Sequence, residues 1–256
     1  MESIIFNSLP NVVSYAFDEC NISTKILDLT DSDKPYIGTS LSNYPGGFTK
    51  AHYHRTLAND GTTWGTITLP FVPASTEGLK FYKLKTMATA AGEQLVFEQV
   101  DNIEAGVPYL FKNASESADF TLTAADPSKV SVELKDQQVD GFALKGSYKT
   151  ETLNASEHPD LYYLSGNKFW HATGTLSALP FRAYIEGDGS SSAKSLTMVV
   201  FDNDEPTTIK GVMDNDGNIY EIEAVYDING RRLTEPKAGQ ANIIRTKSGK
   251  IIKRLF

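Results

Sequence analysis

Two histidines separated by a single residue are the best candidates for metal chemistry in this sequence. His52 and His54 flank Tyr53, and residues two apart in a strand point to the same face. Both imidazoles are therefore expected to lie within reach of one ion. A zinc site needs three or four protein ligands, and nothing in the sequence brings His158 or His171 near this pair. We predict a histidine pair on an edge strand and no metal site.

Two acidic clusters are the candidates for calcium. The segment Asp214–Asn218 begins like a calcium loop, but its glycine stands at the fourth position, whereas the EF-hand pattern has it at the sixth. A Gly after Asn or Asp between two strand-like runs indicates a hairpin turn instead, because these residues tolerate positive φ. Asp202, Asp204 and Glu205 form the second cluster. Weak calcium binding remains an alternative there, and the prediction is that the protein needs no cofactor.

Motifs of nucleophilic and nucleotide-dependent catalysis are absent from the sequence. It has a single cysteine, Cys20, and no G-x-S-x-G, H-E-x-x-H, P-loop or G-x-G-x-x-G pattern. The 32 acidic residues leave a glycosidase pair open, although no two of them stand out. We therefore predict that the protein is not an enzyme, with no catalytic, cofactor-binding or metal-binding residues.

Aromatic side chains are the candidates for ligand binding. Tyr162 and Trp170 belong to one predicted hairpin, and Tyr36 and Tyr44 lie in a loop rich in glycine and proline. Trp and Tyr are favoured anchors of interfaces, and exposed aromatics on β-loops are suited to stacking on sugar rings. The alternative for the hairpin pair is packing in the core. These four residues are predicted as ligand-binding aromatics, for a protein or a glycan.

Composition and charge limit the classes of protein to which this chain can belong. The chain has 256 residues, of which 40% are hydrophobic and 22% charged, which is typical of globular proteins. Its apolar runs are far shorter than the ~20 residues that cross a bilayer, so no transmembrane segment is predicted. The net charge is −8, and residues 231–256 hold eight basic side chains and one acidic, leaving −15 on residues 1–230. No recognition helix or stacking motif accompanies the basic tail, so we predict no nucleic-acid partner.

Local patterns favour strands throughout the chain. Runs of four to eight residues rich in Val, Ile, Thr, Phe and Tyr alternate with Gly, Pro, Asn and Asp. The predicted strands are Ile22–Leu29, Trp64–Phe71, Leu79–Lys85, Gln94–Val100, Pro108–Lys112, Phe120–Thr123, Val130–Leu134, Gly141–Tyr148, Leu161–Leu164, Lys168–His171, Phe181–Glu186, Leu196–Asp202, Thr207–Met213, Asn218–Ile228 and Asn242–Thr246. No window carries a sustained helical stripe, and parallel α/β folds need long crossovers. An all-β, antiparallel fold is predicted.

Three further predictions concern where particular strands, Arg182 and a domain boundary lie in that fold. Leu196–Phe201 is apolar on both faces and predicts a central strand, whereas Asn218–Ile228 alternates and predicts a half-buried one. Arg182 lies between Phe181 and Ala183, so we expect it to pair with a strand carboxylate in a structural role. A polar stretch before Thr207 predicts a boundary between a β-sandwich domain, residues 1–205, and a small basic β domain, residues 206–256.

Several segments in order resemble a β-rich module of secreted and surface proteins of the Bacteroides group, of a cell-adhesion type. They run from LDLTDSDKPY (Leu27–Tyr36) through WGTITLPF (Trp64–Phe71) and EAGVPYL (Glu104–Leu110) to LPFRAYIE (Leu179–Glu186), so residues 26–186 carry most of the motifs. The closing YDINGRR (Tyr226–Arg232) resembles the C-terminal Y-D-x-x-G-R-R segment of such proteins. The resemblance implies an extracellular or cell-surface location and transfers no catalytic residue. The N-terminus lacks the pattern of a signal peptide, so export is expected to use one outside this sequence.

Three functions remain open at this level. The first is an exported, non-enzymatic cell-surface protein for adhesion or ligand binding. The second is a carbohydrate-binding module that uses the exposed aromatics. The third is a hydrolase whose carboxylates the sequence does not mark. Exposed aromatics would favour the second, and a cleft with two carboxylates about 5–9 Å apart would favour the third.

Overall fold

The fold is built almost entirely of β-strands. The computed structural model describes residues 2–7, 22–31, 47–58, 63–88, 94–166, 168–189, 195–201, 211–213, 219–233, 240–246 and 249–255. These residues contain no α-helix and one short 3₁₀ turn, η1 (Pro127–Lys129). Within the same ranges, no helix is long and apolar enough to cross a membrane. The all-β prediction is confirmed.

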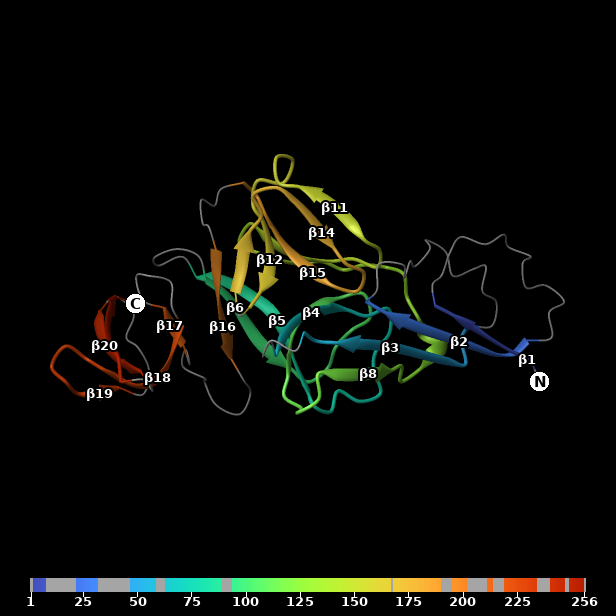
Figure 1. Cartoon of the computed structure of the whole chain (residues 1–256), viewed down its shortest axis with the longest axis horizontal. Coiled ribbons are helices and arrows are strands. Elements are labelled where there is room, and N and C mark those ends of the chain that lie inside the picture. The colour runs from blue at the N-terminus through green and yellow to red at the C-terminus, as the bar shows by residue number, and fades with distance from the viewer. Residues whose placement is uncertain are drawn as a thin grey trace.

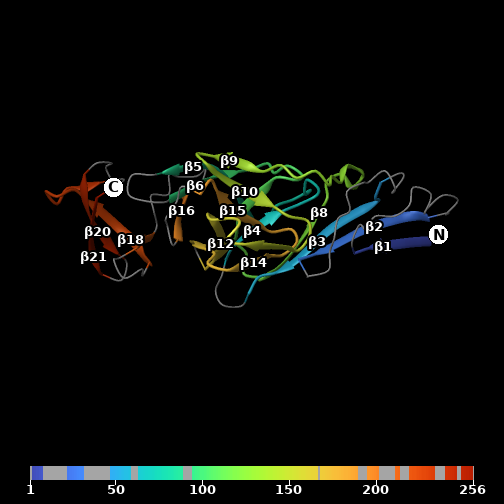
Figure 2. The same ribbon diagram turned by 90° about the horizontal axis from the view of Figure 1, so that it is seen from above.

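The strands of the described residues form four sheets. The N-terminal sheet contains, in spatial order, β1 (Glu2–Phe6), β2 (Ile22–Thr30), β3 (Lys50–Thr56) and β8 (Asp119–Thr123). The central sheet has the order β4 (Trp64–Thr68), β7 (Pro108–Asn113), β5 (Leu79–Ala88), β6 (Gln94–Val100), β16 (Ser195–Phe201), β13 (Lys168–His171), β12 (Leu161–Ser165), β15 (Ala183–Gly187), β10 (Phe142–Gly146) and β9 (Gln137–Val139). The hairpin sheet pairs β11 (Glu151–Asn154) with β14 (Thr175–Ala178). The C-terminal sheet contains β17 (Gly211–Met213), β18 (Ile219–Tyr226), β20 (Ala241–Thr246) and β21 (Ile251–Leu255), with β19 (Arg232–Leu233) paired to β18. Figures 1 and 2 show the N-terminal and C-terminal sheets at opposite ends, with the central sheet between them.

The N-terminal sheet packs face to face on part of the central sheet, as in a sandwich. Leu29 of β2 and Tyr53 of β3 belong to the same buried cluster as Phe81 of β5 and Phe111 of β7. The next residues along β5 and β7 turn to the opposite face and join a second cluster. β7 is therefore buried on both faces, which explains why Pro108–Phe111 is continuously apolar. In β5 both faces are buried at Phe81 and Tyr82, whereas Lys83 and Lys85 are exposed.

The central sheet curls until its two ends meet. Residues of β9 contact β5, and residues of β15 contact β4. Side chains close this seam: the Oε1 atom of Gln137 accepts a hydrogen bond from Leu84 N at 2.8 Å, and its amide nitrogen donates to Pro108 O. Thr66 Oγ1 accepts from Ala183 N at 2.9 Å and donates to Ala183 O at 2.8 Å. The interior of the curl holds the second core.

Most strand pairs are antiparallel, as predicted, but three are not. β1 with β2, β2 with β3, and β6 with β16 pair in parallel. Parallel neighbours need long connections, and the chain supplies one between β6 and β16 by building β7 to β15 in between. β16 lies between β6 and β13, which agrees with the prediction that Leu196–Phe201 is a central strand.

The C-terminal sheet departs from simple alternation. Ala224 and Val225 are adjacent in β18 and both buried, whereas the predicted half-buried strand would bury one of the two. A register shift between Ile222 and Ala224 marks a bulge in the pairing with β20. Beyond it, Ala224 and Val225 pair with the adjacent residues Arg245 and Ile244, so they lie on opposite faces and both faces of β18 are covered at this point. The predicted domain boundary at residues 205 and 206 lies outside the described residues.

Candidate functional site

The predicted histidine pair lies on the outer face of the N-terminal sheet. His52 Nδ1 is 3.1 Å from Thr123 Oγ1, and His54 Nδ1 is 2.8 Å from Thr121 Oγ1. His54 Nε2 is 2.7 Å from Asp28 Oδ1, so both of its ring nitrogens have partners. No group of three or more His, Cys, Asp or Glu side chains in the described part of the chain is arranged to hold a metal ion. The pair shares one face, as the spacing predicts, but the expectation of an edge strand is wrong, because β3 pairs with β2 on one side and β8 on the other. The two acidic clusters at residues 202–205 and 214–218 lie outside the described residues.

The predicted aromatic residues do not form one platform. Tyr36 and Tyr44 lie outside the described residues, and Tyr162 is fully buried in the second core. The expectation that Tyr162 binds a ligand is therefore corrected: side chains alternate along β12, and Tyr162 points inward. Its neighbour Tyr163 points outward, opposite Trp170 of β13.

Tyr163 and Trp170 form the exposed part of this hairpin, and we call them the aromatic pair. Their exposed fractions are 38% and 39%, among the largest of the described aromatic side chains. The Trp170 Nε1–H donates to Ser165 O at 3.1 Å, and Lys168 Nζ lies 4.0 Å from the centre of the indole ring. These contacts hold the Trp170 ring in place on the surface.

The hairpin sheet covers the outer face of β12 and β15 next to the aromatic pair. Leu153 of β11 and Ala178 of β14 pack on Leu161 and Tyr184, which form a third, small core. Tyr162 pairs with Ile185, so the next residues, Tyr163 and Tyr184, point to the same face of the central sheet. Tyr184 is covered and Tyr163 is not, which places the edge of the covering hairpin between them.

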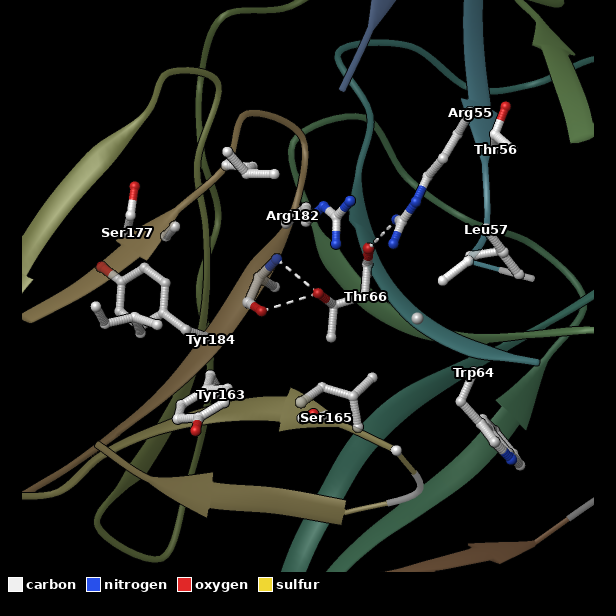
Figure 3. Close-up of a pocket in the computed structure, with 18 residues that line it drawn as sticks. Arg55, Thr56, Leu57, Trp64, Thr66, Tyr163, Ser165, Ser177, Arg182 and Tyr184 are labelled. Atoms are coloured by element: carbon white, nitrogen blue, oxygen red, sulfur yellow. Dashed lines mark hydrogen bonds between the residues drawn. The ribbon is translucent and has the colours of Figure 1, made fainter. Parts of the chain in front are cut away.

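A pocket of about 340 Å³ opens at this edge. It is lined by the end of β3, the start of β4, the outer face of β12 and β15, and the segment that follows β14. Figure 3 shows the guanidinium groups of Arg55 and Arg182 facing each other, with Tyr163 and Tyr184 to one side and Leu57 and Trp64 to the other. The volume is within the range of small-ligand sites, about 300–1,000 Å³.

The two arginines share a single carboxylate oxygen. Asp31 Oδ2 lies 2.7 Å from Arg182 Nη2 and 3.4 Å from Arg55 Nε. The shorter contact is a hydrogen bond, whereas the longer one lacks hydrogen-bond geometry, which leaves Arg55 Nε without a partner among the described residues. Two positive charges against one negative leave a net charge of +1 on this cluster.

Arg55 is the buried member of the cluster. Its side chain is 3% exposed, against 37% for Arg182. It donates to Thr66 O at 2.7 Å, and its guanidinium lies 5.1 Å from the centre of the Phe111 ring. Gly65 makes this arrangement possible, because a Cβ at that position would lie 2.6 Å from the Phe111 ring and 3.1 Å from Arg55 Nη2.

Burial shifts the ionisation of the groups around the cluster. Burial lowers the pKa of Arg55, which the nearby Asp31 opposes, and arginine remains charged under all ordinary conditions. Burial also raises the pKa of Tyr53 to about 12, so its phenol keeps its proton at neutral pH. The charge of the cluster is therefore fixed by the two arginines and Asp31.

The sequence identified part of this site and missed the rest. Arg182 pairs with a carboxylate as expected, but the partner, Asp31, follows β2 and does not belong to a strand. Arg55, Asp31 and Tyr163 were not singled out. One signal was present: His52 and His54 alternate outward, which turns Tyr53 and Arg55 inward, and a charged residue at an inward position indicates a buried ion pair.

The described residues that line the pocket supply cations, hydroxyls and aromatic rings but no carboxylate, histidine or cysteine. Such a lining can hold an anionic or hydroxyl-rich molecule in place. Comparisons with protein-family models, with curated proteins and with solved structures return no match for this chain.

Proposed function

We propose that this chain is an exported, non-enzymatic protein of the cell surface that binds a glycan, with the pocket and the aromatic pair as its binding site. Adhesion to a glycan-bearing surface would be the biological result. The proposal joins two of the functions left open by the sequence, ligand binding at the surface and the use of exposed aromatics.

The observation that carries the proposal is the position of Tyr163. Its ring is exposed beside Trp170 on the outer face of the central sheet, and the same side chain lines the pocket. Flat aromatic rings bury large areas at little entropic cost and have faces that suit the C–H side of a sugar ring. An exposed aromatic surface that leads into a polar pocket can hold two adjoining units of a chain.

The lining favours binding over hydrolysis. Glycosidases place two carboxyl groups about 5–9.5 Å apart across the bond that they cleave. Among the described residues that line the pocket, none is Asp or Glu, and Asp31 next to it is engaged by two arginines. The hydrolase hypothesis therefore gains no support at this pocket.

The proposed location rests on the sequence. The ordered motifs from Leu27 to Glu186 and the closing Tyr226–Arg232 segment resemble exported modules of the Bacteroides group. Protease treatment of intact cells that express the full gene tests this part. Loss of the protein before lysis supports a surface location, and full protection contradicts it.

The binding function is tested with a glycan array run beside a panel of host-matrix proteins. We expect glycan binding that the double variant Tyr163→Ala/Trp170→Ala weakens at least about tenfold, since interface anchors of this kind contribute about 2 kcal/mol. Leu134→Ala is the matched control, because Leu134 is similarly exposed, at 40%, and lies away from the pocket lining. Binding to a matrix protein that the double substitution leaves unchanged would contradict the proposal. Absence of binding on both panels would also contradict it.

A further inference from the structure

We propose that the pocket is selective for a sugar that carries a carboxylate, a uronic or sialic acid unit, with Arg182 holding the carboxylate. This inference rests on the proposed glycan-binding function and names the class of ligand at the same site. It follows from the charge, the geometry and the lining of the pocket.

The charge of the pocket is positive and small. Arg55 and Arg182 are the charged side chains among the described lining residues, and Asp31 offsets one of them. The remaining charge of +1 matches a monoanion. A phosphate monoester carries about −1.5 to −2 at neutral pH and would leave the site with an excess of negative charge.

The geometry suits a planar anion that meets Arg182. Arg55 is almost completely covered and stands behind, whereas more than a third of the Arg182 side chain is exposed. Only its Nη2 is committed to Asp31 in the hydrogen bonds of the described residues. A guanidinium offers donors in a rigid fork that fits a carboxylate in two-point contact. Arg55 supplies charge and fixes Asp31, which in turn orients Arg182.

The rest of the lining suits a sugar ring better than an aliphatic acid. Thr56, Ser165 and Ser177 contribute hydroxyls, and Tyr163 and Tyr184 contribute aromatic rings. A fatty acid would leave those hydroxyls facing an apolar chain, which costs free energy for each unpaired group. A sugar ring presents hydroxyls at its rim and C–H groups on its face, so it matches both kinds of neighbour.

Positive charge continues along the aromatic surface outside the pocket. Lys168 Nζ lies 4.0 Å from the Trp170 ring centre, and Lys112 Nζ lies 5.5 Å from the Trp64 ring centre. Both amines sit beside rings at the borders of the site. An acidic oligosaccharide would therefore meet favourable charge at the units that follow the one in the pocket.

The test compares ligands that differ only at the carboxylate. Titration calorimetry or NMR is run with methyl glucuronide, its uncharged amide, methyl glucoside, glucose 6-sulfate, glucose 6-phosphate and N-acetylneuraminic acid. We expect one of the two carboxylate sugars to bind at least about tenfold more tightly than any uncharged or phosphorylated analogue, since charge-assisted contacts are about twice as strong as neutral ones. Equal binding of the glucuronide and its amide without tighter binding of N-acetylneuraminic acid, or binding of the sulfate as tight as that of the better carboxylate sugar, would overturn the assignment.

Two variants act in opposite directions. Arg182→Gln should remove the preference for the carboxylate sugar over its uncharged amide. Asp31→Asn keeps an amide oxygen that can accept from Arg182 and so preserves its orientation, while it raises the charge of the cluster from +1 to +2. It should therefore tighten binding of the carboxylate sugar. Arg232→Gln is the matched control, since it is an exposed arginine of the C-terminal sheet. Thermal unfolding of each variant identifies any that fail to fold, and Asp31→Asn keeps the test decisive if Arg182→Gln is one of them.

The outcomes separate this inference from the proposed function. Binding of uncharged glycans through Tyr163 and Trp170, with no preference for carboxylates, overturns the inference and leaves the proposed function standing. Absence of any glycan binding overturns both. A preference for carboxylates that Asp31→Asn weakens also overturns the inference, because added positive charge would then oppose binding.

Discussion

Asp31 and Glu186 each serve two basic side chains among the described residues, and the two clusters differ in which polar atoms lack hydrogen-bond partners. Asp31 offers one oxygen to both Arg55 and Arg182. Glu186 divides its oxygens: Oε2 lies 2.8 Å from Lys145 Nζ, and Oε1 lies 2.5 Å from His158 Nδ1. Each carboxylate oxygen of Glu186 has its own basic partner, whereas in the Asp31 cluster Arg55 Nε and Arg182 Nε have no hydrogen-bond partner among the described residues.

The surroundings of the two clusters reinforce the difference. The hydrogen bond that Lys145 donates to Glu186 raises the pKa of Lys145, and Asp136 and Glu151 lie near enough to raise it further. The Glu186 cluster is thus rich in acidic groups, whereas the Asp31 cluster has an excess of positive charge and borders a pocket. A cluster in which every charged group has a partner within the protein holds strands together. A cluster that borders a cavity and has excess charge can also hold a ligand.

The largest expected effect comes from removing the buried cation. Arg55→Met should lower the free energy of unfolding by about 3–5 kcal/mol, because it removes a buried cation that lies over the Phe111 ring and is one of the two cations that hold Asp31. Thr66 O would lose its donor as well. Urea denaturation measures the change, and a loss below about 1 kcal/mol would show that Arg55 is not structurally required.

The floor of the pocket gives the second effect. Gly65→Ala should cost about 1–3 kcal/mol, since its Cβ would overlap the Phe111 ring and crowd Arg55. Gly174→Ala is the control, because a Cβ there meets nothing within 4 Å. Equal unfolding midpoints for the two variants would contradict the close packing of β4 on β7.

The fold was predictable from local pattern to a considerable extent, and the exceptions have physical causes. Leu161–Leu164 and Lys168–His171 were predicted as strands and are β12 and β13, because alternation and the glycine turn at Gly166 agree. Val130–Leu134 was predicted as a strand and is none. It follows the 3₁₀ turn as extended chain, with Ser131 N bonded to Pro70 O in an isolated contact. A segment becomes a strand only where the edge of another strand is free to pair with it, and the local sequence pattern carries no information about that neighbour.

The site was harder to predict than the fold. Tyr162 and Tyr163 are identical residue types, and only the direction of the curl decides which of them is exposed. Asp31 and Arg182 are 151 positions apart and meet because the N-terminal sheet packs beside the start of β15. A contact between sheets so distant in sequence follows from tertiary packing, so no spacing rule predicts it.

The Glu186 cluster gives a smaller effect on stability than the Asp31 cluster. Lys145→Met should cost about 0.2–1 kcal/mol, since its side chain is partly exposed and water can replace it. Urea denaturation beside Arg55→Met compares the two clusters directly. A cost as large as that of Arg55→Met would remove the distinction between them.

The smallest effect is a dependence on pH that belongs to the Glu186 cluster. Partial burial alone would raise the pKa of Glu186, but hydrogen bonds from Lys145 and His158 outweigh it and hold the pKa below its usual value. A group whose pKa is lowered by folding stabilises the protein above its unfolded pKa, about 4.3 for Glu, and loses that contribution as the pH falls through the folded value. The difference in unfolding free energy between the native chain and Glu186→Gln should therefore be constant near neutrality and shrink below about pH 4. Urea denaturation from about pH 6 to pH 3 measures it, with Glu116→Gln as an exposed control. A difference that stayed constant to pH 3 would mean that the carboxylate charge of Glu186 contributes nothing, and that its two contacts matter through packing alone.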